Sequence, residues 1–159
     1  MLPCRPSPQS LPSRSARQRR DRQSARHGEA DMEEALWALL TGSSAVQAVC
    51  GQRIFWGEAP DGTPLPYVVL HLVSGADTPH LRGTDGLWRY RVQIDCYGAD
   101  RPAASALHRA VVALLNGYST FTGSGLTGCF LDSTRDDTED AASRRVSRFS
   151  SDFNIIWRA

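Results

Sequence analysis

The clearest pattern in this 159-residue sequence is Trp88-Arg89-Tyr90-Arg91-Val92-Gln93-Ile94-Asp95-Cys96. Its apolar residues occupy every second position, and polar residues occupy the positions between them. A strict period of two predicts a β-strand that buries one face and keeps the other polar. The polar face consists of Arg89, Arg91, Gln93 and Asp95.

Four other segments have the composition of strands, and their spacing predicts the sheet. They are 53–56, 67–73, 127–131 and 144–157, and the last of them also alternates apolar and polar residues. Gly- and Pro-rich loops are expected at 57–66 and 74–86, and an acidic turn at 132–142. Short connections between paired strands favour antiparallel pairing.

Three segments have helical patterns. Asp31 is expected to cap a helix with an apolar leucine stripe, Ser44 to cap a short helix that ends at Gly51, and Asp100 to cap a helix that ends at Asn116. The sequence therefore predicts an α+β fold: a mainly antiparallel sheet of four or five strands, with two helices packed on one face.

Residues 1–31 differ in composition from the rest of the chain. They contain seven arginines against three acids and few large apolar residues, which predicts a disordered Arg/Pro/Ser-rich tail. Three interpretations stay open: a translation start assigned upstream of Met32, an inert tail, or a basic arm that contacts DNA. Residues 32–159 are expected to form a single α+β domain, which contains eleven arginines and fourteen acids.

No catalytic, cofactor or metal site is predicted. The Gly123–Gly128 stretch matches G-x-G-x-x-G but precedes a predicted strand, whereas a dinucleotide site needs a helix there. The acidic run from Asp132 to Asp140 lacks the glycine of a calcium loop. The four cysteines are far apart: Cys4 lies in the tail, and Cys50, Cys96 and Cys129 are expected to be buried thiols in a reducing compartment. The longest apolar run, 110–115, is too short to cross a membrane.

Two interpretations of the polar face of strand 88–96 stay open: an ordinary solvated face, or a contact between subunits. The second predicts that Arg89 and Arg91 lie at a subunit boundary. Reversing both charges would then weaken assembly and leave the monomer folded.

The order of the segments from Met32 to Trp157 resembles a known family. The segments are MEEALWALL, GQRIFWGEAPDGTPLPYVVLHLVSG, YRVQIDCYG with the helix that follows it, and SRFSSDFNIIW after the acidic residues. Together they resemble the tail-completion or tail-terminator proteins of long-tailed phages and of phage-like gene transfer agents. Residues 1–31 depart from the family's pattern.

The resemblance implies a structural protein that needs no cofactor. Such proteins form a hexameric ring that caps the tail tube, joins it to neck and head-completion proteins, and lets DNA pass without specific binding. The chain would be made in the bacterial cytoplasm and reside at the head-proximal end of a particle tail. The alternatives are a neck adaptor or stopper, and a small DNA-binding protein that uses the basic arm.

Overall fold

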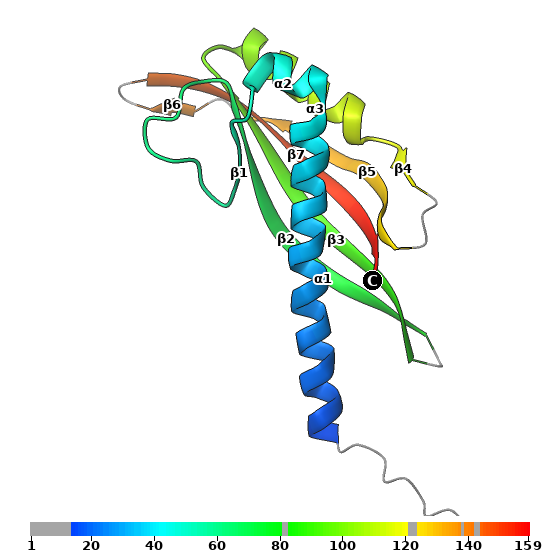
Figure 1. The fold of residues 1–159 in the computed structure, drawn as a ribbon. Coiled ribbons are helices and arrows are strands. Elements are labelled where there is room, and N and C mark those ends of the chain that lie inside the picture. The colour runs from blue at the N-terminus through cyan, green and yellow to red at the C-terminus, as the bar shows by residue number, and fades with distance from the viewer. Residues whose placement is uncertain (1–13, 81–82, 121–123, 138, 142–143) are drawn as a thin grey trace, which may run out of the picture.

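A computed structural model describes residues 14–80, 83–120, 124–137, 139–141 and 144–159 (Figure 1). These residues form three helices and seven strands. In chain order the elements are α1 (Arg14–Gly42), α2 (Ser44–Cys50), β1 (Ile54–Trp56), β2 (Tyr67–His80), β3 (Gly83–Gly98), α3 (Arg101–Leu115), β4 (Tyr118–Ser119), β5 (Gly125–Asp136), β6 (Glu139–Ala141) and β7 (Arg144–Arg158).

The strands confirm the predicted α+β class with a mainly antiparallel sheet. Their order is β1-β2-β3-β7-β5-β4, and β6 pairs with β7 outside this path. Only the short β1–β2 pair is parallel among the described strands. The sheet exceeds the predicted four or five strands because β4 and β6, of two and three residues, are too short to show an alternating pattern.

Most of the predicted loop 74–86 is instead the extension of a β-hairpin, and residues 81–82 lie outside the described residues. β2 continues to His80 and pairs with β3 from Gly83 onward. β1 pairs with β2 only as far as Leu70, so the rest of β2 is an edge strand, which tolerates Pro79. Gly75 accommodates the ring of Tyr90, since a Cβ there would stand 2.7 Å from two of its atoms.

The predicted acidic turn 132–142 is also mostly strand. β5 runs through Asp136, and β6 follows at Glu139–Ala141. Arginines offset the acids of β5: Arg101 Nε lies 2.8 Å from Asp136 Oδ2, and Arg91 Nη2 lies 3.4 Å from Asp132 Oδ2. Local sequence did not show these pairs, because both arginines come from other elements.

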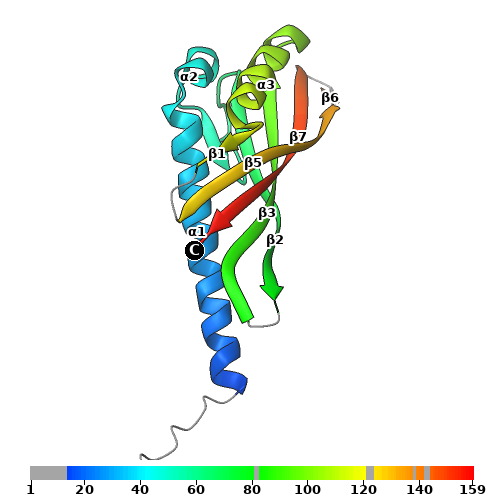
Figure 2. The same cartoon turned by 90° about the vertical axis from the view of Figure 1, so that its right-hand side faces the viewer.

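Helix α1 begins at Arg14, well before the predicted cap Asp31, so residues 14–31 of the predicted disordered tail are helical. Arginine, glutamine and alanine make up most of this stretch and are strong helix formers, although they supply no apolar stripe. The blue first turns of α1 project past the ends of β2 and β3 (Figures 1 and 2). Residues 1–13 lie outside the described residues.

The caps of the other two helices are local. Ser43 rather than the predicted Ser44 caps α2, and its hydroxyl accepts a hydrogen bond from Val46 N. Asp100 caps α3 as predicted, with Oδ1 2.8 Å from Ala103 N. Within the described residues, no helix has both the length and the apolarity that a membrane span would need.

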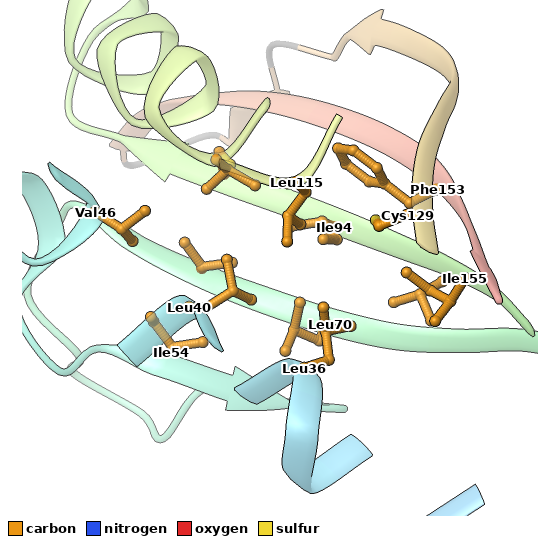
Figure 3. Close-up of a cluster of buried hydrophobic side chains, with 14 of the residues drawn as sticks. Leu36, Leu40, Val46, Ile54, Leu70, Ile94, Leu115, Cys129, Phe153 and Ile155 are labelled. Atoms are coloured by element: carbon orange, nitrogen blue, oxygen red, sulfur yellow. The ribbon is translucent and has the colours of Figure 1, made fainter. Parts of the chain in front are cut away.

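As predicted, two helices, α1 and α3, pack on one face of the sheet. The short helix α2 packs against both of them and adds Val46 and Cys50 to the buried core (Figure 3). Leu36 and Leu40 of α1 and Leu115 of α3 are fully buried, as are Ile94 and Phe153 of the central strands. Burying a large aliphatic or aromatic side chain contributes about 1.5–3 kcal/mol. Cys50, Cys96 and Cys129 are buried free thiols, as predicted, and Cys4 lies outside the described residues.

Candidate functional site

The described helices lie on one side of the sheet, and we call the other side the uncovered face (Figures 1 and 2). It carries polar side chains from four strands. The alternation of each strand and the pairing register place these residues on the same side. Its principal polar residues are His71 of β2, Arg89, Arg91, Gln93 and Asp95 of β3, Ser133 and Arg135 of β5, and Asp152 of β7.

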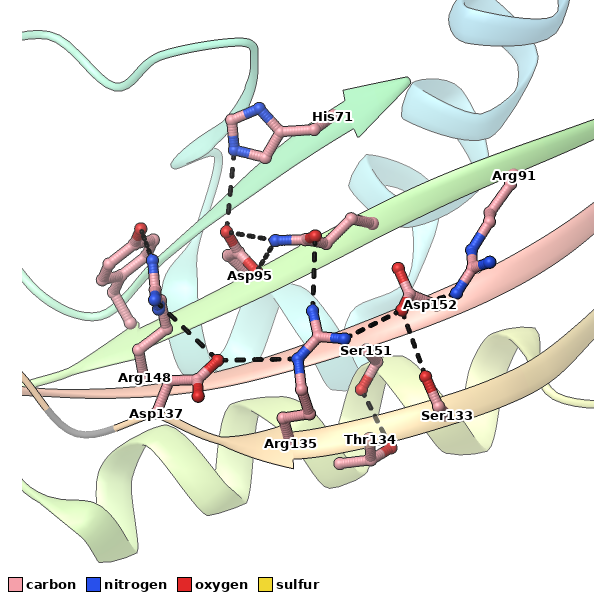
Figure 4. A network of polar contacts seen from close by, with 12 residues as sticks. His71, Arg91, Asp95, Ser133, Thr134, Arg135, Asp137, Arg148, Ser151 and Asp152 are labelled. Carbon is pink, nitrogen blue, oxygen red and sulfur yellow. Dashed lines mark hydrogen bonds and ion pairs between the residues drawn. The ribbon is translucent and has the colours of Figure 1, made fainter. Parts of the chain in front are cut away.

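A network of polar contacts connects three of the four predicted residues, namely Arg91, Gln93 and Asp95 (Figure 4). Gln93 Nε2 donates to Asp95 Oδ1 at 3.0 Å, and His71 Nε2 lies 3.6 Å from Asp95 Oδ2. Arg135 Nη2 donates to Gln93 Oε1 at 3.4 Å. Arg89 is exposed, and none of the ion pairs between described residues includes it.

Asp152 is the centre of this network and was not predicted from the sequence. Its Oδ2 lies 3.1 Å from Arg91 Nη2, 3.2 Å from Arg135 Nη1 and 3.1 Å from Ser133 Oγ. Burial by itself raises the pKa of Asp152, but the hydrogen bonds and charges of these partners outweigh it and lower the pKa. The alternation of 144–157 places Asp152 on the polar face, but only the register shows which residues surround it.

Two carboxylates are buried on this face although none of the described helices covers it. Asp95 is 2% exposed and Asp152 is 3% exposed. The longer side chains of Arg91 and Arg135, which are about half exposed, surround Asp152 and neutralise it. Phe130, 50% exposed and paired with Asn154 in the register, adds an aromatic side chain to the same face. Arginine and aromatic side chains held in fixed positions are typical of protein–protein interfaces.

A serine–histidine pair lies on the opposite face, under α3. His108 Nε2 and Ser151 Oγ are 2.8 Å apart, and Ser151 Oγ is 3.1 Å from Thr134 Oγ1. The two residues are 43 positions apart, so no local sequence pattern predicted this pair. Ser151 is 1% exposed, and His108 stacks on Phe149 with ring centroids 5.2 Å apart. The pair therefore connects α3 to the sheet and offers no accessible nucleophile.

Acidification is expected to destabilise the fold through His108. Burial lowers the pKa of His108 from its ordinary 6.5, so the unfolded chain takes up this proton at a higher pH than the folded chain does. The free energy of unfolding therefore falls as the pH drops below about 6.5. Urea unfolding between pH 7.5 and 5 should show a shallower decline for His108→Gln than for the wild type. Equal declines would contradict this assignment.

The acids of the described residues do not form a metal site. No group of three or more potential metal-ligating side chains occurs among these residues. Asp137 of the predicted acidic run instead lies 3.8 Å from both Arg135 Nε and Arg148 Nη2. This arrangement of acids and arginines allows ion pairs between neighbouring strands and with a complementary charged surface of another protein.

Comparisons with known proteins agree with the fold. Residues 34–158 match the sequence model of a family described as Tail completion protein gp17. A chain from a structure described as the virion of a native gene transfer agent particle is similar in fold, with a TM-score of 0.63 and 20% sequence identity. The match covers 78% of this chain and 92% of that chain. A search of curated protein sequences finds no match.

Proposed function

Because this chain belongs to the Tail completion protein gp17 family, we propose that it acts as a tail terminator, a ring of six subunits that caps the tail tube at its head-proximal end. The ring would join the tube to neck and head-completion proteins and let DNA pass through its lumen. The observation that carries the proposal is the family match over nearly all the residues after Met32, which includes every strand.

The uncovered face supports a role in contacts between subunits. A closed ring needs heterologous contacts, in which one surface of a subunit meets a different surface of the next. The sheet provides two different faces, one covered by helices and one polar with buried, neutralised carboxylates. We propose that Arg89, Arg91, Gln93 and Asp95 lie at this subunit boundary, with Arg89 available to pair across it.

Charge supports passage of DNA without binding. Residues 32–159 carry eleven arginines against fourteen acids, a net charge of −3. Tight binding of a phosphate backbone needs clustered cations. On the uncovered face Arg91 and Arg135 are both paired with Asp152, which leaves them less able to hold phosphate.

Particles that lack this chain should have tails of abnormal length or tails not joined to heads. The expected defect follows because nothing would stop tube growth or present a surface to the neck. Negative-stain electron microscopy of a deletion strain and of a strain that re-expresses the full chain measures tail length and the joined fraction. Tails of normal length joined to heads in the deletion strain would refute the proposal. A subunit located one layer nearer the capsid would identify it as a neck adaptor or stopper.

A further inference from the structure

A groove of about 330 Å³ lies at the edge of the sheet, where α1 meets β1. We call it the α1–β1 groove, and it is lined by Ala30, Glu33, Glu34, Trp37 and Trp56. Trp37 is 41% exposed, and its Nε1 donates to Ile54 O at 3.1 Å, which fixes the ring beside β1. The groove therefore combines two aromatic walls with two carboxylates.

The two glutamates lack cationic partners in the described structure. No basic residue stands three or four positions from Glu33 or Glu34 along α1, and no ion pair between described residues includes either of them. Burial, reinforced by the charge of Glu29, raises the pKa of Glu33. A guanidinium group can stack on a tryptophan and pair with a carboxylate, so an arginine fits this groove.

The same helix carries a matching set of cations. Six arginines and a single acid occur in residues 14–26, at the start of α1. α1 is continuous from Arg14 to Gly42, so at 1.5 Å per residue the middle of the arginine-rich segment lies about 20 Å from Glu33 along the axis. The segment therefore cannot fold back into its own groove while α1 stays helical.

We propose that the arginine-rich start of α1 in one copy, residues 14–26, docks in the α1–β1 groove of a neighbouring copy. The arm of each copy would be basic and its groove acidic, so the contact is heterologous and can repeat around a ring. This inference rests on the proposed ring function and adds a contact separate from the uncovered face. The projection of α1 past the ends of β2 and β3 places the arm where a neighbour can be reached (Figure 2).

A charge-swap experiment on the full chain tests the docking. The arm variant carries Arg17→Glu, Arg19→Glu and Arg20→Glu, and the groove variant carries Glu33→Arg and Glu34→Arg. In sedimentation velocity at low salt, the wild type should self-associate and each variant alone should associate at least about tenfold more weakly. An equimolar mixture should recover association, because the acidic arm of one variant meets the basic groove of the other. High salt should weaken the wild-type contact.

Two controls keep the result interpretable. Glu58→Arg with Asp61→Arg reverses two exposed acids of the segment between β1 and β2, neither of which lines the groove, and should leave association unchanged. Glu33→Gln with Glu34→Gln removes the charges with little change in shape and should also weaken association. This variant replaces the groove variant if the groove variant fails to fold. Circular dichroism checks the fold of every variant.

Four outcomes would overturn the docking. The wild type could stay monomeric at the highest concentration reached, or the charge reversals could leave its association unaffected. The mixture of the two variants could fail to recover association, or the arm variant could lose only its binding to duplex DNA. The last would make the arm a DNA contact. Failure of the ring function would be seen separately, as normal joined tails in particles that lack the chain. If the arm variant restores normal tails to the deletion strain, only the docking fails.

Discussion

Gly98→Ala is expected to lower the free energy of unfolding by about 3 kcal/mol, the upper part of the usual range for overpacking. Gly98 ends β3, where α3 packs directly against the strand. An added Cβ would stand 2.3 Å from Ala104 N and 2.8 Å from Ala104 Cα. These are backbone atoms of the first turn of α3, whose Ala104 N donates to Asp100 O, so relief requires the helix to move.

Gly42→Ala is the matched control for this substitution. Gly42 is exposed at the end of α1, and an added Cβ would meet no atom within 4 Å. Alanine in a helix is favoured over glycine by about 0.5–1 kcal/mol, so no loss of stability is expected. Urea unfolding followed by circular dichroism measures both variants. Equal stability of Gly98→Ala and the wild type would show that α3 does not sit against β3 as described.

Arg91→Glu is expected to destabilise the monomer by about 2–3 kcal/mol. The substitution removes the guanidinium 3.1 Å from Asp152 Oδ2 and brings a third carboxylate beside Asp152 and Asp132. Breaking a buried ion pair costs about 3–5 kcal/mol, and the partial exposure of Arg91 together with the remaining Arg135 reduces that cost. Chemical unfolding measures the loss. The sequence predicted that reversing both charges leaves the monomer folded, but Arg91→Glu by itself is expected to destabilise the monomer. The role of this face in assembly is therefore tested at Arg89 alone.

Arg89→Glu is expected to leave monomer stability within about 0.5 kcal/mol of the wild type, as exposed substitutions usually do. If Arg89 lies at the subunit boundary, assembly should weaken about tenfold, or about 1.4 kcal/mol. Arg109→Glu makes the same change of charge on the exposed side of α3 and serves as the control. The joined fraction of complemented particles measures assembly. Normal assembly with Arg89→Glu would remove Arg89 from the boundary.

Elements with strong local signals could be predicted from the sequence. The alternation of 88–96 and 144–157 gave the two central strands and the faces they bury, because burial of one face imposes a period of two. Asp100 gave the start of α3 because a cap acts within three residues. The start of α1 was missed because helix propensity without an apolar stripe resembles disorder.

The arrangement of the site depends on long-range pairing that local patterns do not contain. Arg91 and Asp152 are 61 residues apart, and His108 and Ser151 are 43 apart. Two strands that are each predicted correctly can still pair in several registers, and a shift of register changes every partner. The sequence could therefore indicate Arg91 as a surface candidate but not the buried carboxylate that holds it.

A reconstruction of the intact particle by electron cryomicroscopy is the decisive test of the proposed ring. We expect six copies of this fold in one ring, between the last layer of the tail tube and the neck, with the uncovered face of each sheet against the next copy. Density for this chain in another layer, or its absence from purified particles, would refute the tail-terminator proposal.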